Sequence, residues 1–175
     1  MQQLNCESAS PRMFVLRHSF TFKCSYSLLR TRTLIAVTRY LRLYMTALQK
    51  LKAAQSLQSP TPMTVYRGIK RNVRRENPDQ YDTDAMLIWW SPSSATEKMH
   101  VLTSPRFVGT EGERTIFTIE TSKAVRISMF SAIQEEEEVL LPPGTALVVK
   151  SHANFGAGLT MVQMCDDPDA PELIV

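Results

Sequence analysis

The stretch EEEEVLLPPG, residues 135–144, decides how the rest of the chain is interpreted. A block of like charge usually lies on a solvated loop, so an acidic strand end wetted by solvent is the simplest interpretation of the four glutamates. They lead, however, into an apolar run and a Pro-Pro-Gly turn, which predicts a strand over residues 136–141. On a strand, Glu136 and Glu138 share one face. Two neighbouring carboxylates repel, so we expect a cation or a cationic transition state beside them.

Two motifs precede the acidic run. Residues 65–68 (VYRG) end a short apolar stretch with Arg67 and Gly68, and residues 88–96 (IWWSPSSAT) form an aromatic segment that opens into hydroxyl-bearing residues. Each has a plain structural explanation when taken alone. An arginine at a strand end is commonly a surface residue, and Ser-Pro-Ser-Ser is a typical turn sequence.

An arginine, a serine and a Glu-x-Glu pair, in this order on three strands, resemble the active-site signature of the arginine-specific mono-ADP-ribosyltransferases. This class includes clostridial and cholera-like toxins and their eukaryotic relatives. The order and spacing of further segments are also similar to the family, and the resemblance covers about residues 28–164. These segments are residues 112–119 (GERTIFTI), 130–132 (FSA), 139–145 (VLLPPGT) and 158–162 (GLTMV).

The resemblance implies an α+β fold, in which a sandwich of two packed, mainly antiparallel sheets follows an N-terminal helix and holds NAD, or NADP, as a substrate in the central cleft. The residue pattern favours the same class, because a helix expected over residues 33–54 precedes short strands without β-α-β alternation. No GxGxxG motif follows a strand, so NAD is not expected to bind through a Rossmann fold. The expected strands are residues 63–66, 86–90, 115–119, 124–127, 136–141, 146–149 and 159–164.

The catalytic roles are implied by the resemblance. Glu138 is expected to accept a hydrogen bond from the nicotinamide ribose and to stabilise an oxocarbenium-like transition state, and Glu136 to hold the guanidinium of the acceptor. Ser94 matches the first residue of the family's Ser-Thr-Ser motif and is expected to orient the catalytic glutamate. Ala95 departs from that motif, and Ser91 or Ser93 competes for the role. A register shifted by one residue selects Glu135 and Glu137 instead.

The NAD-binding residues implied by the resemblance are Arg67, Gly68, Ser94 and Phe117. A guanidinium can grip phosphate or ribose oxygens with two bonds, and a glycine beside it admits the dinucleotide close to the backbone. Phe117 is expected to line the nicotinamide side, with a plain core position as the alternative. Residues 128–134 are expected to form the loop that meets the acceptor.

Charge is distributed unevenly along the chain. Residues 1–75 hold 14 of the 20 lysines and arginines and one acid, whereas residues 76–175 hold 6 bases and 16 acids. We expect the two halves to pack together and neutralise each other locally, rather than to bind nucleic acid, because the bases are not gathered in a groove-reading motif. Three widely spaced cysteines and three histidines without ligand spacing predict neither a disulfide framework nor a metal site. No apolar run suggests a membrane span, and the sequence slightly favours an intracellular protein.

We expect the chain to divide into an N-terminal extension that is poorly ordered or unrelated to the domain, residues 1–27, and an ADP-ribosyltransferase catalytic domain, residues 28–175. Within the domain we expect a helical part, 28–58, a β-rich NAD-binding core, 63–165, and a short tail. Because family members usually carry more helical sequence before the matched region, we expect part of the N-terminal subdomain to be missing. The helix is expected to pack on the sheet through a stripe formed by Leu34, Val37, Leu41, Tyr44, Leu48 and Leu51.

These observations favour an enzyme that transfers ADP-ribose from NAD to arginine side chains of an unidentified protein acceptor and releases nicotinamide. Two alternatives stay open. One is an NAD glycohydrolase, in which water is the acceptor, and the other is a binding module that keeps the fold without turnover.

Overall fold

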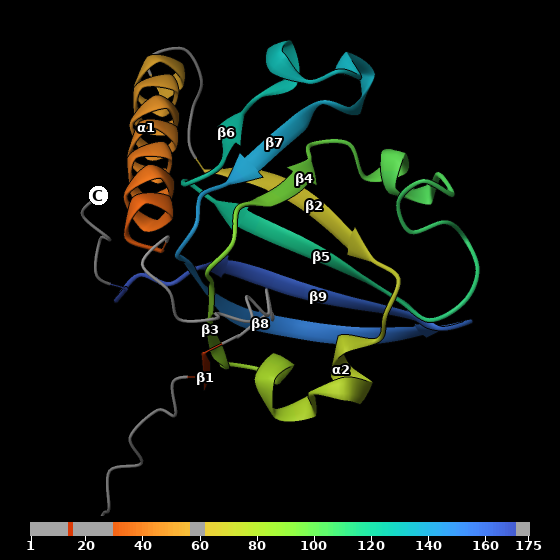
Figure 1. The fold of residues 1–175 in the computed structure, drawn as a ribbon. Coiled ribbons are helices and arrows are strands. Elements are labelled where there is room, and N and C mark those ends of the chain that lie inside the picture. Colours follow the sequence, from red (N-terminus) through yellow and green to blue (C-terminus); the bar gives the residue numbers. More distant parts are fainter. Residues whose placement is uncertain (1–13, 16–29, 57–61, 171–175) are drawn as a thin grey trace, which may run out of the picture.

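The computed structural model describes residues 14–15, 30–56 and 62–170, with the side chains of the first helix described from residue 37. A long helix stands beside a strongly bent sheet, and short helices fill the connections (Figure 1). In chain order the elements are β1 (Phe14–Val15), α1 (Arg30–Ser56), β2 (Met63–Ile69), α2 (Val73–Glu76), the 3₁₀ helix η1 (Pro78–Tyr81), β3 (Met86–Trp89), β4 (Ser93–Thr96), η2 (Met99–Thr103), β5 (Arg114–Thr121), β6 (Val125–Arg126), η3 (Ser128–Phe130), η4 (Gln134–Glu136), β7 (Glu138–Leu141), β8 (Thr145–Gly156) and β9 (Leu159–Asp166).

The strands form one hydrogen-bonded sheet with the order β1-β3-β8-β9-β5-β2-β4-β7-β6. Two parts can be distinguished in it, because β2 and β4 are joined through a single residue pair, Tyr66 with Thr96. On one side of this seam β2 pairs with β5 over seven residues, and on the other β4 pairs with β7 over four. The two packed sheets expected from the sequence are therefore two parts of one continuous sheet.

The two parts enclose a common core. β3 lies far from β4 in the strand order, yet only residues 90–92 connect them, so the ends of these strands are at most about 14 Å apart. The sheet must therefore bend back on itself. Buried side chains from both parts meet in one cluster, which includes Val65 and Phe117 from the larger part and Val139 and Leu141 from the smaller.

The predicted α+β class is confirmed, and each predicted strand overlaps an observed one. Pairing between strands is antiparallel except for β1 with β3 and β5 with β9. β5 is buried on both faces along most of its length, as its position between β2 and β9 requires. Residues 93–96, interpreted from the sequence as a possible turn, instead form β4, which pairs with β7.

The predicted packing of α1 is only partly correct. Leu48 is buried and Leu51 is half-buried, but Val37 and Leu41, from the same stripe, are exposed. Leu34 lies outside the residues whose side chains are described. The last turns of the helix reach the end of β6 with polar side chains, because Lys52 Nζ and Gln55 Nε2 donate to main-chain carbonyls of residues 124 and 126 at 3.1 and 2.7 Å.

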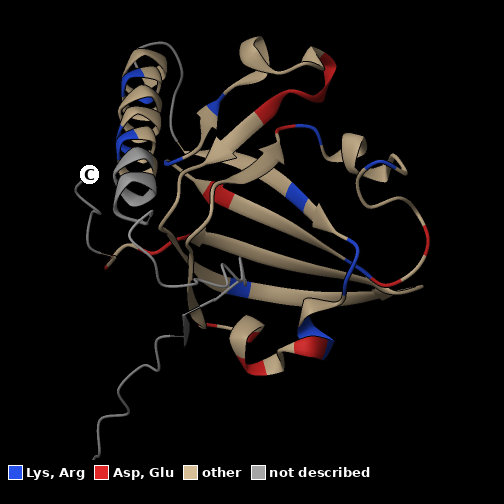
Figure 2. Cartoon of the chain, in the orientation of Figure 1, with Lys and Arg blue, Asp and Glu red and all other residues tan. Residues whose placement is uncertain are grey.

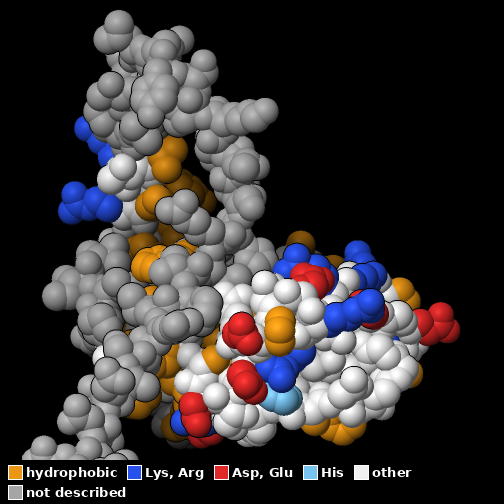
Figure 3. All heavy atoms as spheres, turned by 90° about the horizontal axis from the view of Figure 1, so that it is seen from below, with side chains coloured by type: hydrophobic (Ala, Val, Ile, Leu, Met, Phe, Trp, Pro, Cys, Tyr) orange, Lys and Arg blue, Asp and Glu red, His pale blue; other side chains and the backbone are white. Residues whose placement is uncertain are grey.

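Local neutralisation of charge is seen between the basic and acidic halves of the sequence. Arginines of the segment 71–75 pair with acids from the second half, at 3.4 Å for Arg71 with Glu76 and for Arg74 with Asp82. The face that carries α2 shows basic and acidic side chains interspersed (Figure 3). α1 carries only basic charges among those coloured, whereas acids gather at the start of β7 (Figure 2).

Candidate active site

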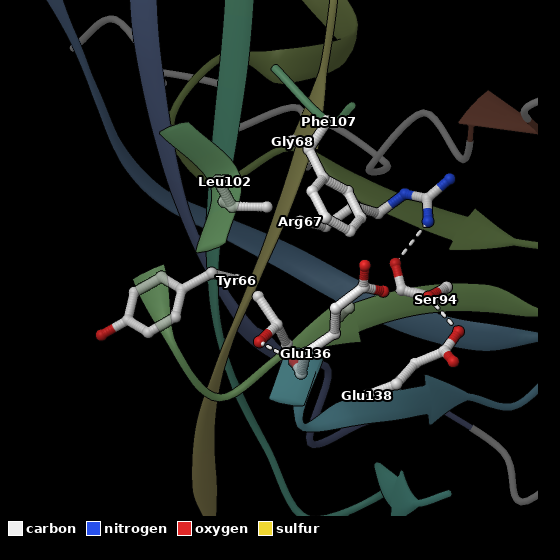
Figure 4. Close-up of a pocket in the computed structure, with 10 residues that line it drawn as sticks. Tyr66, Arg67, Gly68, Ser94, Leu102, Phe107, Glu136 and Glu138 are labelled. Atoms are coloured by element: carbon white, nitrogen blue, oxygen red, sulfur yellow. Dashed lines mark hydrogen bonds between the residues drawn. The ribbon is translucent and has the colours of Figure 1, made fainter. Parts of the chain in front are cut away.

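A pocket of about 130 Å³ lies at the seam between β2 and β4. Side chains from β2, β4, η2, η4 and β7 converge on it (Figure 4). Its lining consists of Tyr66, Arg67, Gly68, Ser94, Ala95, Thr96, Leu102, Phe107, Glu136 and Glu138. All three motifs singled out in the sequence therefore reach one pocket.

Ser94 connects the two sides of this pocket. Its hydroxyl donates a hydrogen bond of 2.6 Å to Oε1 of Glu138, and its main-chain carbonyl accepts one from Nη1 of Arg67. The hydroxyl holds the Glu138 carboxylate in place without neutralising it. Ser91 and Ser93, the competing candidates, do not line the pocket, and the Ser93 hydroxyl donates to the Ser91 carbonyl at 3.2 Å.

The backbone of the acidic run differs from the prediction. β7 begins only at Glu138, Glu136 ends the 3₁₀ helix η4, and Glu137 between them has a φ of 43°. The two pocket glutamates therefore do not share a strand face, because Glu136 lies in a 3₁₀ helix and the left-handed Glu137 separates it from β7. Both nevertheless line the same pocket, Glu136 from the end of η4 and Glu138 from the start of β7. A 2.7 Å hydrogen bond from the Thr96 hydroxyl to the Glu136 carbonyl helps to hold the end of η4 beside β4.

The structure also separates the four glutamates by environment. Glu135 is exposed and Glu137 pairs with Lys98, and neither lines the pocket. Glu136 and Glu138 both line it. The pair that lines the pocket is thus the one singled out in the sequence, and the pair of the shifted register, Glu135 and Glu137, lies outside it.

The Arg67 guanidinium rests on a column of aromatic rings. It lies 5.7 Å from the centre of the Trp89 ring, which meets Phe117 edge-on at 5.4 Å, and Phe117 contacts Tyr81 at 5.8 Å. Burial lowers the pKa of Arg67 below its usual value, an effect that Tyr81 opposes. A guanidinium stays charged at any ordinary pH, so Arg67 gives the pocket a fixed cation supported from the core.

Phe117 itself does not reach the pocket, which corrects its assignment to the cofactor-binding residues. Its side chain is only 2% exposed and belongs to the core. It packs against the Trp89 ring, and this ring in turn contacts the Arg67 guanidinium. The aromatic residues that do line the pocket are Tyr66 and Phe107, and the sequence analysis missed Phe107. The signal available was a single aromatic residue in a polar loop sequence, TSPRF.

Gly68 has a packing role that the sequence did not suggest. A Cβ at this position would lie 1.9 Å from Cγ2 of Val108 and 3.6 Å from Cδ1 of Leu102. The missing side chain therefore lets the segment 98–109 pack directly on β2, which brings Phe107 to the pocket. The close approach of a dinucleotide to Gly68 stays a prediction.

Comparison with known proteins identifies the family. A model of the NAD:arginine ADP-ribosyltransferase family matches residues 34–163, most of the chain. The chain belongs to this family. No protein of curated function matches it by sequence alone.

Solved ADP-ribosyltransferase structures share the fold. The ADP-ribosyltransferase Vis in complex with agmatine is 18% identical, with a TM-score of 0.57 over 77% of this chain and 60% of that chain. The Vis toxin from Vibrio splendidus is 16% identical, with a TM-score of 0.59 over 84% and 64%. The Salmonella SpvB ATR domain is 16% identical, with a TM-score of 0.57 over 82% and 76%. The chain thus spans somewhat less than two thirds of the Vis chains.

Metal-binding clusters and membrane-spanning helices are both absent from the described residues. In residues 14–15, 30–56 and 62–170, no group of three or more His, Cys, Asp or Glu side chains is placed to hold a metal ion. The same part of the chain contains no helix that is both long and apolar enough to cross a membrane.

Proposed function

We propose that the chain transfers ADP-ribose from NAD to arginine side chains of a protein acceptor and releases nicotinamide. The observation that carries the proposal is the convergence of Glu136 and Glu138 on one pocket beside a fixed guanidinium, Arg67. The family supplies NAD as the donor, and the pocket offers the groups that its chemistry requires. NADP stays an alternative donor.

Arg67 is proposed to bind the pyrophosphate or the ribose of NAD. A planar guanidinium can give two hydrogen bonds to such oxygens, and its contact with the Trp89 ring helps to hold it in the pocket. Phe107 and Leu102 offer apolar contacts on another wall of the same pocket. Together these groups would hold the nicotinamide ribose over the two carboxylates.

Glu138 is proposed to stabilise the transition state. As the bond between nicotinamide and ribose breaks, the bonding electron pair leaves with nicotinamide and positive charge develops on the sugar. A carboxylate already oriented by the Ser94 hydroxyl can oppose this charge without reorganising. Ser94 is therefore assigned a positioning role.

Glu136 is proposed to select the acceptor. An arginine side chain is protonated at any ordinary pH, so a carboxylate can both pair with the guanidinium and take a proton from it as the new bond to ribose forms. The side chain of Glu136 is 23% exposed, which leaves it accessible from the protein surface.

The test is nicotinamide release from NAD by the purified chain, with and without agmatine as a small arginine analogue. Release that rises with agmatine, together with ADP-ribosyl-agmatine, is the expected result. Release without transfer would identify a glycohydrolase instead. No release from a folded sample that binds NAD would favour the binding module.

A further inference from the structure

We propose that Arg106 is an acceptor of ADP-ribose within its own chain, so that the protein modifies itself in cis at this residue. The inference rests on the proposed function and concerns a residue to which no role has been assigned above. It follows from the ion pair between Arg106 Nη1 and Glu136 Oε1, which are 3.9 Å apart. The carboxylate proposed to hold the acceptor guanidinium therefore already faces a guanidinium of the same chain.

The loop that carries Arg106 is held firmly beside the pocket. Val108 fills the space over Gly68, and the Phe107 amide donates to the Ser104 carbonyl at 3.0 Å. Lys70 Nζ donates to the carbonyl of residue 105 at 2.8 Å. The residue that follows Arg106 lines the pocket, so the arginine is tethered one residue from it.

The Arg106 side chain is free to move from this fixed backbone. It is 71% exposed, and at 3.9 Å its ion pair with Glu136 is loose. A solvated ion pair of this kind contributes little free energy, so it neither locks the arginine nor blocks the glutamate. Glu135 and Glu137 offer no equivalent partner for Arg106, because neither lines the pocket and Glu137 pairs with Lys98.

The step is the proposed transfer with an internal acceptor. The bond between C1 of the ribose and the nicotinamide nitrogen breaks, and its electron pair leaves with nicotinamide. A bond forms from the same carbon to a guanidinium nitrogen of Arg106, while the displaced proton passes to Glu136 and then to solvent. Because the acceptor is tethered, its effective concentration is of millimolar order or higher, and the rate per molecule is independent of protein concentration.

The experiment incubates the purified chain with NAD and maps ADP-ribose on its arginines by mass spectrometry. Arg75 is the matched internal control, because its side chain is 74% exposed but pairs with Glu113 away from the pocket. We expect at least about 10²-fold more ADP-ribose on Arg106 than on Arg75, as tethering predicts. Dilution of the protein is expected to leave the modified fraction at a given time unchanged, and agmatine to reduce it by competition.

Two variants complete the test. Arg106→Lys keeps the positive charge but removes the guanidinium, so labelling of the chain should be lost while agmatine is still labelled. Arg75→Lys should label like the wild type. Labelled agmatine with unlabelled Arg106, equal labelling of both arginines, or a rate that rises with protein concentration would overturn self-modification in cis. Failure of the proposed function is distinguished from these results by the absence of nicotinamide release and of agmatine labelling.

Discussion

The two sides of the pocket are built differently. On the β2 side, Arg67 stands on a column of rings that runs into the core, where Phe117 is almost completely buried. On the β7 side, two short 3₁₀ helices precede Glu138, and Glu136 ends the second of them. Met129 and Phe130, in the first, are 68% and 71% exposed. Under the proposed function, the donor is bound by an arginine that the core supports, whereas the acceptor is met by exposed side chains.

The largest expected effect is that of Glu138→Gln. The substitution keeps the shape of the side chain but removes the charge that opposes the developing cation, so nicotinamide release should fall by about 10²–10³-fold. NAD affinity, which we assign to the β2 side, should change little. Rates are measured by nicotinamide release and affinity by calorimetry.

Glu135→Gln is the matched control, because this glutamate belongs to the same run but is exposed outside the pocket. Its activity should equal that of the wild type. A Glu138→Gln protein that turns over normally would refute the catalytic assignment.

Glu136→Gln is expected to separate the two activities. Transfer to agmatine should fall by about 10²-fold, because the acceptor loses both its partner and its proton acceptor, whereas hydrolysis of NAD should continue. The control is Glu137→Gln, which removes only the ion pair with Lys98. Equal loss of transfer and hydrolysis would show that Glu136 is not an acceptor residue.

Gly68→Ala tests the packing of the β2 side. The added methyl group overlaps Val108, so the free energy of unfolding should decrease by about 2 kcal/mol, within the usual range for overpacking. Val108→Ala in the same chain should relieve part of this loss, and a double-mutant cycle in chemical denaturation measures the coupling. Additive effects of the two substitutions would mean that they do not touch.

Arg67→Lys is expected to have the smallest effect of the four. Lysine keeps the charge but lacks the planar fork that can give two hydrogen bonds, and its contact with the Trp89 ring differs from that of the guanidinium, so the Kd for NAD should rise by about tenfold, or about 1.4 kcal/mol. Arg71→Lys, at an exposed ion pair with Glu76, should bind NAD normally. An unchanged Kd for NAD in Arg67→Lys would mean that residues other than Arg67 bind the donor.

The sequence predicted the fold class and most of the strands, though not β4, because apolar runs and turns are local signals. It also singled out Glu136 and Glu138, which both line the pocket, but it placed them on one strand face, which they do not share. Their catalytic roles stay predictions. Non-glycine residues with positive φ are uncommon, and a run of identical glutamates does not indicate which one adopts it. In the structure it is Glu137, whose side chain pairs with Lys98 from another segment.

Phe117 and Phe107 were out of reach for a related reason. The strand TIFTIET is apolar on both faces, so alternation cannot distinguish a core phenylalanine from one that lines a pocket. Phe107 lies in an irregular segment without periodicity. Its position depends on Val108 packing over Gly68, a contact between residues 40 positions apart.

The seam between β2 and β4 limits how firmly the two parts of the sheet are joined beside the pocket. One residue pair, Tyr66 with Thr96, joins the two parts there, and the Arg67–Ser94 hydrogen bond crosses it. A hydrogen bond from a charged donor contributes about 1.5–3 kcal/mol, which is a few times the thermal energy RT. Few contacts therefore join the two parts of the sheet at the pocket. A ligand that binds Arg67 and Glu138 at the same time would add a further link between these two parts.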